Sequence, residues 1–252
     1  MILAIDVGNT LTKFGLHDGE GWTLVERCTT PQVIEDVSRS PLSGLAGQAQ
    51  VVVGCSVVPE ATRALEARVP VRWLTAQNVG IPIRYGPPWS VGADRLANAL
   101  ALRELARPAI ALDIGSATTF DVVDREGAFA GGAILPGPAL WLKSLAQGTA
   151  QLPEGAMDQP AAALGTTTIG GLQSGLYFGL LGALERVAAE LSDELQQGET
   201  RQTTLLAITG GYARLIESAL DESDVLRAYA VTVQSVPHLT LDGLVCFHRL
   251  GF

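Results

Sequence analysis

The chain has 252 residues, 47% of them hydrophobic, and its mean hydropathy is +0.26. This length allows one large domain or two small ones with an ample core, and the composition is that of a globular protein without disordered tails. The formal net charge of −9, with no basic patch in the sequence, argues against a nucleic-acid partner. It does not exclude a nucleotide, which needs only local donors and a metal.

The cysteines and the N-terminal residues indicate where the protein works. Cys28, Cys55 and Cys246 are odd in number, widely separated and without a CxxC pair, which favours reduced thiols. The chain begins with a strand pattern rather than a basic signal segment, and no apolar run approaches the roughly 18 residues of a membrane span. We therefore expect a cytoplasmic protein without a membrane partner.

The first part of the chain reads as a mixed sheet with helices. Its patterns predict strands over 2–6, 12–16, 23–27, 51–54 and 71–74, and helices over 31–45 and 60–67. The order βββαβαβ is typical of helices packed on a mixed sheet.

The segment 81–95 has adjacent prolines and two glycines, which predict a stiff, irregular loop. It leads to Asp94 and Arg95 at the start of an apolar helix over 96–105. Asp94 could simply cap the helix and favour its dipole. Arg95 opposes that dipole, however, and an Asp–Arg pair beside a rigid loop suits a small polar substrate.

One pattern occurs twice, as LAIDVGNTLTKF over 3–14 and as IALDIGSATTF over 110–120. Each copy is an apolar run that ends in an aspartate, Asp6 or Asp113, followed by a glycine and hydroxyl residues. Both copies continue into a second β-rich segment with a glycine-containing turn. The repetition predicts a duplicated domain whose halves each present a loop to one shared ligand.

The chemistry of the two loops points to phosphate. Glycine turns bring backbone N–H groups close to an anion, hydroxyls add donors, and Lys13 adds positive charge. Asp6 and Asp113 would repel phosphate, but they fit as direct or water-mediated ligands of the cation that accompanies a nucleotide. The alternative is two ordinary hairpins in which each aspartate caps a turn.

The second half begins after Arg107-Pro108 and is rich in glycine. A backbone-exposing segment over 131–137 is followed by a helix from 141, a Pro- and Ala-rich excursion over 151–165, a helix over 169–194 and a polar loop over 196–203. A buried strand over 205–208 then ends in Thr209-Gly210-Gly211, a turn that can seat a nucleobase or ribose. A closing helix begins near residue 239.

These segments, in this order, resemble the type III pantothenate kinases of the acetate-and-sugar-kinase, heat-shock-chaperone and actin superfamily. The motifs are DVGNTLTK (6–13), YGPPWSVGADR (85–95), DIGSATTFDVV (113–123), GGAILPG (131–137), TTTIGGLQSG (166–175) and TGGYA (209–213). The first and third look like the two phosphate loops of the superfamily, and TGG looks like its adenosine loop. GADR is the most diagnostic, because relatives in the superfamily do not share it.

The resemblance implies an α/β fold of two ribonuclease H-like (actin-like ATPase) domains, with mixed sheets flanked by helices around an ATP cleft. We expect the domains to be 1–108 and 109–252. The implied activity is ATP-dependent phosphorylation of the primary hydroxyl of pantothenate to 4'-phosphopantothenate, the first committed step of coenzyme A synthesis.

The resemblance also implies roles for individual residues. Asp94 would accept the hydroxyl proton, Asp113 would bind a monovalent cation (K⁺ or NH₄⁺), and Asp6 would lie near Mg²⁺. Pantothenate would be held by Tyr85, Gly92, Ala93, Asp94, Arg95 and Thr168, with Thr168 coming from the partner subunit of a homodimer. ATP would be held by Asp6, Val7, Gly8, Asn9, Thr10, Leu11, Thr12, Lys13, Ser116, Thr209, Gly210 and Gly211.

The sequence departs from the family pattern at four positions, and none removes a catalytic group. Ser116 stands where threonine is usual, Thr167 where asparagine is common, and Gly170 and Gly171 replace larger residues, which predicts a looser helix start. Two alternatives remain: a kinase or phosphatase of the same superfamily with another small substrate, and a nucleotide-binding regulatory protein. YGPPWSVGADR argues against the first, and the chain is too short to append a peptide-binding domain of a chaperone.

Overall fold

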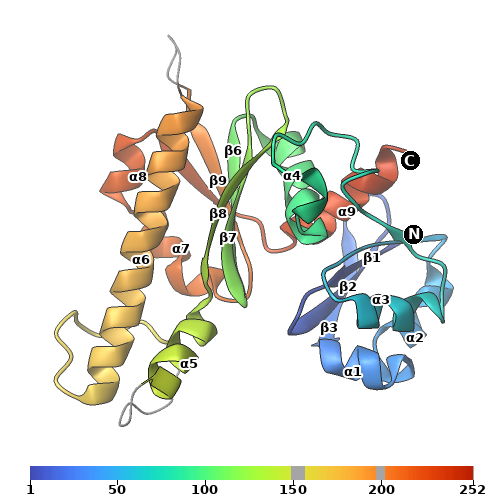
Figure 1. The fold of residues 1–252 in the computed structure, drawn as a ribbon, viewed down its shortest axis with the longest axis horizontal. Coiled ribbons are helices and arrows are strands. Elements are labelled where there is room, and N and C mark those ends of the chain that lie inside the picture. Colours follow the sequence, from blue (N-terminus) through green and yellow to red (C-terminus); the bar gives the residue numbers. More distant parts are fainter. Residues whose placement is uncertain (149–156, 197–201, 252) are drawn as a thin grey trace. The chain divides into compact units, whose positions relative to one another are not determined.

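The computed structural model describes residues 1–148, 157–196 and 202–251, so parts of the predicted excursion over 151–165 and loop over 196–203 lie outside the described residues. The chain forms two compact units (Figure 1). Unit 1 comprises residues 1–105, 127–130 and 238–252, and unit 2 comprises residues 106–126 and 131–237.

This division differs from the expected one at residue 108. The C-terminal residues, which we expected in the second domain, pack in unit 1, and so does the short segment 127–130. The C-terminal helix α9 (Leu239–Arg249) buries Leu239, Leu241, Leu244 and Phe247 almost completely. It packs on helix α4 (Ala93–Leu105) and on the first strand, so burial of its apolar face decides its place rather than its position in the sequence.

The sheet of unit 1 has the order β3-β2-β1-β4-β5. Its strands are β1 (Ile2–Val7), β2 (Leu11–His17), β3 (Trp22–Thr29), β4 (Val51–Ser56) and β5 (Arg72–Trp73). The first three strands pair antiparallel, and β4 and β5 continue the sheet parallel to β1. Helix α3 (Pro59–Glu66) and the 3₁₀ turn η3 (Pro88–Ser90) complete the elements before α4.

The single helix predicted over 31–45 is wrong. The chain instead forms α1 (Thr30–Glu35), the 3₁₀ turn η1 (Val37–Arg39), α2 (Leu42–Leu45) and the 3₁₀ turn η2 (Ala46–Gln48). Asp36 is extended, with φ −155° and ψ 92°, and its carboxylate accepts hydrogen bonds from the backbone N–H and hydroxyl of Ser38. That local bond competes with the helix and ends it.

The sheet of unit 2 has the order β10-β9-β6-β7-β8. Its strands are β6 (Ala109–Ile114), β7 (Ala117–Val123), β8 (Phe129–Pro136), β9 (Thr204–Thr209) and β10 (Val231–Ser235). Its helices are α5 (Pro138–Gly148), α6 (Thr168–Leu195), α7 (Ala213–Asp221) and α8 (Asp224–Ala228). The segment 131–137, expected only to expose its backbone, thus lies largely in the edge strand β8.

The two sheets have the same strand order, which confirms the duplication and the α/β fold class. In each, an antiparallel hairpin (β1–β2 or β6–β7) is followed on one side by a third strand and on the other by parallel strands. Each unit has its own core, around Leu3, Ile5 and Phe14 in unit 1 and around Ile110, Leu112 and Phe120 in unit 2. The aspartates therefore end equivalent central strands on two independent scaffolds.

Candidate active site

The first predicted phosphate loop joins β1 to β2 and is fastened to the start of α1. The N–H of Gly8 donates to the carbonyl of Leu11 at 3.1 Å, and the hydroxyl of Thr30 donates to the carbonyl of Gly8 at 2.6 Å. The hydroxyls of Thr12 and Thr30 are hydrogen-bonded at 3.0 Å and both side chains are buried. The loop is therefore held from within, and its exposed side chains are those of Asn9 and Thr10.

Asp6 lies between donors from both neighbouring strands. It is paired with Lys13 on β2 and with Cys55 on β4 in the sheet register. The ammonium of Lys13 is 3.3 Å from Oδ2 of Asp6, and the thiol of Cys55 donates to Oδ1 at 3.5 Å. Burial, followed by the charges of Asp6 and Asp94, raises the pKa of the Cys55 thiol well above its ordinary value, so the thiol keeps its proton and remains a donor.

Asp94 lies in the first turn of α4, and its carboxylate is folded back over the preceding glycine. Its Oδ1 accepts the N–H of Arg95 at 2.8 Å, and a Cβ placed on Gly92 would lie 2.5 Å from that oxygen. Burial, and then the charge of Asp6, raises the pKa of Asp94 above the ordinary aspartate value. Gly92 thus leaves room for a carboxylate that is more basic than usual.

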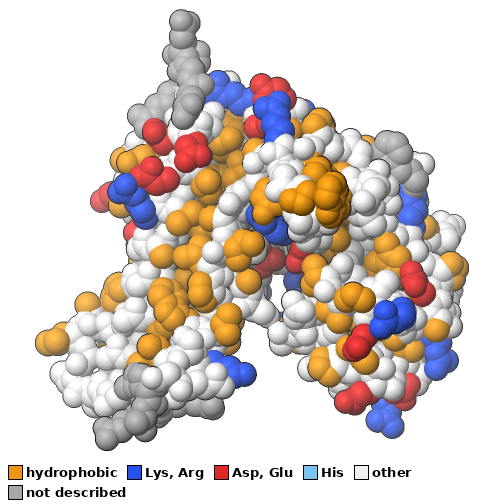
Figure 2. All heavy atoms as spheres, in the orientation of Figure 1, with side chains coloured by type: hydrophobic (Ala, Val, Ile, Leu, Met, Phe, Trp, Pro, Cys, Tyr) orange, Lys and Arg blue, Asp and Glu red, His pale blue; other side chains and the backbone are white. Residues whose placement is uncertain are grey.

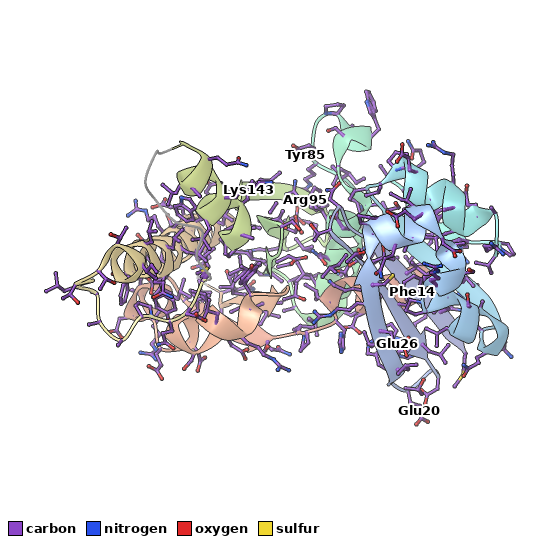
Figure 3. All side chains as sticks on the ribbon, turned by 90° about the horizontal axis from the view of Figure 1, so that it is seen from below. Phe14, Glu20, Glu26, Tyr85, Arg95 and Lys143 are labelled. Carbon is purple, nitrogen blue, oxygen red and sulfur yellow. The ribbon has the colours of Figure 1, made fainter. Side chains whose placement is uncertain are left out.

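Tyr85 and Arg95, both labelled in Figure 3, share one aromatic neighbour, Phe129. Arg95 is only 8% exposed, and its guanidinium carbon lies 5.5 Å from the centre of the Phe129 ring. The Tyr85 ring is 6.1 Å from the same ring at an interplanar angle of 56°. Phe129, an aromatic residue just after the Glu126-Gly127 turn, is not among the residues predicted from the sequence.

The second predicted phosphate loop, in unit 2, joins β6 to β7 and is one residue shorter. Residues 8–11 separate the paired Val7 and Thr12, whereas residues 115–117 separate Ile114 and Thr118. The N–H of Gly115 donates to the carbonyl of Ala117 at 3.0 Å. Gly137, which follows β8, packs on this turn: its N–H donates to the carbonyl of Ser116 at 3.2 Å, and a Cβ there would overlap the loop backbone.

The Thr209–Gly211 turn lies directly beside Asp113. Thr209 is paired with Asp113 in the sheet, and the N–H of Tyr212 donates to the carbonyl of Ile114 at 3.0 Å. Gly210 has φ +99°, and a Cβ on it would lie 2.5 Å from both Oδ1 of Asp113 and the N–H nitrogen of Ile114. The structure therefore brings together the predicted adenosine turn, Asp113 and the second loop.

The unusual residues at the start of α6 have a structural reason. Thr167 is the N-cap, and its hydroxyl accepts the N–H of Gly170 at 3.0 Å. A Cβ on Gly165 would collide with the backbone of Gly170 and Gly171, so these glycines let the preceding loop approach the helix closely. Thr168 is the first residue of the helix and is exposed.

The predicted site residues thus form two groups. Asp6–Lys13, Tyr85 and Gly92–Arg95 lie in unit 1, whereas Asp113, Ser116, Thr168 and Thr209–Gly211 lie in unit 2. Within the described residues, no group of three or more histidine, cysteine or acidic side chains is arranged to hold a metal ion by itself. No helix in that part of the chain is long and apolar enough to cross a membrane.

Solved structures with this fold include proteins of several kinds. A Campylobacter jejuni protein described as a Baf family transcriptional activator has a TM-score of 0.64 at 18% identity, covering 99% of this chain and 98% of its own. A Sinorhizobium meliloti protein described as a 2-dehydro-3-deoxygalactonokinase has a TM-score of 0.61 at 14% identity, covering 99% and 96%. At these identities the similarity concerns the fold alone.

Sequence comparison is more specific. The family model for type III pantothenate kinase matches residues 2–190. Type III pantothenate kinases from Dehalococcoides mccartyi and Rhodospirillum rubrum are 35% and 36% identical to this chain, each over 99% of it and 98% of their own length. The chain belongs to the type III pantothenate kinase family.

Proposed function

We propose that this protein transfers the γ-phosphoryl group of ATP to the primary hydroxyl of pantothenate, giving 4'-phosphopantothenate in the first step of coenzyme A biosynthesis. Membership of the family supports the reaction. The structural observation that carries the proposal is Asp94, a carboxylate with a raised pKa in the first turn of α4, in the same unit as the loop that ends β1.

Asp94 is the general base of the proposed mechanism. A primary alcohol is a poor acid, so a carboxylate within hydrogen-bond reach takes the hydroxyl proton as the oxygen bonds to the γ-phosphorus. The bond from that phosphorus to the β–γ bridging oxygen breaks, ADP leaves, and the proton remains on Asp94. Burial and the charge of Asp6 make Asp94 a stronger base than a free aspartate.

Arg95 recognises the other end of the substrate. Its planar guanidinium can pair with the carboxylate of pantothenate through two parallel hydrogen bonds. Tyr85 in the loop before α4, and Gly92 and Ala93 at the start of α4, would contact the same substrate, and Thr168 of the partner subunit would complete the site.

The loops hold ATP. Residues 6–13 and Ser116 contact the phosphates through backbone N–H groups, hydroxyls and Lys13, and Thr209–Gly211 receives the adenosine, because no side chain projects from Gly210 or Gly211. Val7 and Thr12 are buried, so their side chains support the first loop from inside while its backbone faces the nucleotide.

The aspartates fit the cations that the family implies. Mg²⁺ keeps most of its waters and takes one or two carboxylates, which suits the single carboxylate of Asp6. Asp113 presents an oxygen against the open backbone of Gly210 and Gly115, and hard oxygen donors of this kind suit K⁺ or NH₄⁺. Bound there, the cations would neutralise phosphate charge.

A homodimer is supported by the surface of unit 2. Large apolar side chains are exposed on β8, on α5 and beside or on α6: Ile134 64%, Leu140 52%, Leu164 82%, Ile169 50% and Phe178 43%. Figure 2 shows hydrophobic side chains gathered over these elements. Exposed apolar side chains of this kind are typical of an interface, and Leu164 and Ile169 lie on either side of Thr168 in the chain.

Three unpaired cysteines support a cytoplasmic location.

The test is phosphorylation of pantothenate by the purified protein with Mg·ATP, in KCl or in NaCl. We expect product in KCl and much less in NaCl. Equal rates of product formation in both salts would support the kinase activity and contradict the proposed binding of a monovalent cation by Asp113. Absence of product in both salts, from folded protein that binds ATP, would favour another small substrate or a regulatory protein.

A further inference from the structure

Phe129 is bound by its backbone to the loop that precedes α4. Its N–H donates to the carbonyl of Pro82 at 2.9 Å, and its carbonyl accepts the N–H of Arg84 at 2.8 Å. Phe129 and Ile83 form a parallel β-bridge. These bonds fix the position of the Phe129 ring relative to Tyr85, which directly follows the bridged residues.

The segment around Phe129 reaches unit 1 from the other half of the chain. Residues 127–130 belong to unit 1, although the residues on both sides of them belong to unit 2. The segment begins at Gly127, which has φ +80°, and a Cβ at this residue would lie 2.9 Å from Nε of Arg103 on α4. The segment is thus seated against α4 at one point and against the 82–84 backbone at another.

The Phe129 ring packs against the buried guanidinium of Arg95. Phe129 is completely buried, Arg95 is 8% exposed, and the guanidinium lies within about 6 Å of the ring centre, the range of a cation–π interaction. An arginine side chain has many rotamers, and holding it in one of them before the substrate arrives lowers the entropy cost of binding. The ring also limits the directions in which the planar guanidinium can face.

We propose that Phe129 is a positioning residue for pantothenate binding: its ring holds the Arg95 guanidinium in the orientation that receives the substrate carboxylate. This inference rests on the proposed function. Phe129 does not touch the reacting atoms, and it acts through Arg95. An ordinary core phenylalanine would contribute to the stability of unit 1 without changing substrate recognition.

The first experiment is Phe129→Leu, which keeps an apolar side chain and removes the aromatic ring. We expect KM for pantothenate to rise roughly tenfold, while kcat and KM for ATP change less than about twofold. Phe247→Leu is the matched control, because Phe247 is also completely buried in unit 1 and also lies under an arginine, with Arg72 4.7 Å from the ring centre. We expect it to lower the melting temperature and leave KM for pantothenate unchanged.

A double-mutant cycle with Arg95→Ala separates the positioning role from packing. If Phe129 acts through Arg95, Phe129→Leu raises KM for pantothenate in the native background and adds less than about twofold in the Arg95→Ala background. An effect through Tyr85, or through general loosening, would be the same in both backgrounds and would overturn the proposal. An unchanged KM in the single variant would overturn it as well.

A ring-fluorinated phenylalanine at position 129 covers the case in which Phe129→Leu does not fold. Fluorination weakens the negative face of the ring with little change in shape, so we expect KM for pantothenate to rise with the number of fluorines while the melting temperature stays nearly constant. A KM independent of fluorination would refute the role. If the unmodified protein does not phosphorylate pantothenate, the proposed function fails; if it does, and these variants keep its KM, only the inference about Phe129 fails.

Discussion

At the scale of single residues, two carboxylates of unit 1 have different environments. Asp6 is hydrogen-bonded to Cys55 and ion-paired with Lys13, whereas Asp94 has a backbone N–H as its neighbour and a pKa raised by burial and by Asp6. The raised pKa of Asp94 fits its proposed role, because a general base must accept a proton. The simpler hypothesis, in which Asp94 only caps α4 and favours its dipole, predicts an unchanged kcat and a lower melting temperature for Asp94→Asn.

Asp94→Asn tests the base. We expect the variant to fold and bind ATP and to lose about 10²–10⁴-fold in kcat, because the amide cannot take the hydroxyl proton. Steady-state kinetics and a nucleotide-binding titration provide the measurements. Glu60→Gln is the control, since Glu60 is an acidic residue in the first turn of another helix of unit 1, and its kcat should be unchanged. An unchanged kcat in Asp94→Asn would remove Asp94 from its role.

Asp94→Asn should lose activity but gain stability at neutral pH. The pKa of Asp94 is raised in the folded state. Between the ordinary aspartate pKa of about 4 and this raised pKa, the folded protein therefore binds more protons than the unfolded chain, and the free energy of unfolding falls as the pH rises. We therefore expect Asp94→Asn to melt at a higher temperature than the native protein at pH about 7, with the gain disappearing below the ordinary aspartate pKa of about 4. Glu60→Gln should lower the melting temperature slightly, through loss of the dipole interaction. A lower melting temperature for Asp94→Asn at neutral pH would favour the capping role.

At the scale of elements, glycines allow backbones to meet at the second loop. Gly210 turns with positive φ against Asp113 and Ile114, and Gly137 packs on the carbonyls of the β6–β7 turn. Three segments far apart in sequence therefore share one small volume in unit 2. The motifs identified each segment, but their mutual contacts depend on the paired strands β6 and β9.

Gly210→Ala should damage both the fold and nucleotide binding. The added methyl group would meet Asp113 and Ile114, and alanine disfavours the positive φ. We therefore expect the free energy of unfolding to fall by about 1–3 kcal/mol and KM for ATP to rise. Gly211→Ala is the control for stability, because nothing lies within 4 Å of its Cβ position. Denaturant unfolding of both variants measures the difference, and equal free energies would contradict the close contact.

At the scale of the whole molecule, the chain passes between the units after residues 105, 126, 130 and 237. The last passage brings α9 onto α4, where a Cβ on Gly243 would overlap the carbonyl of Ala97. The hydroxyl of Thr240 donates to the side-chain oxygen of Asn98 at 2.9 Å, and the indole of Trp22 donates to Asp242 at 2.7 Å. Unit 1 is therefore completed by α9, which packs on α4.

Gly243→Ala should weaken the packing of α9 on α4. The methyl group would force α9 away from α4, and overpacking of this kind costs about 1–3 kcal/mol. Gly21→Ala, in the same unit and with nothing within 4 Å of its Cβ position, should leave the free energy of unfolding nearly unchanged. A Gly243→Ala protein as stable as the native one would show that the close contact of Gly243 with Ala97 is not needed for stability.

The sequence by itself determined the elements whose signals are local. The two hairpins, their aspartates, and Gly92–Arg95 at the start of α4 were predictable, because alternating apolar residues, glycine turns and duplicated motifs act over a few residues. Only the tertiary structure decided the rest: the break of the predicted helix at Asp36, the return of α9 to unit 1, and Phe129 beneath Arg95. These features depend on the burial of surfaces that meet from distant parts of the chain, and a periodic pattern shows which face is apolar but not what covers it.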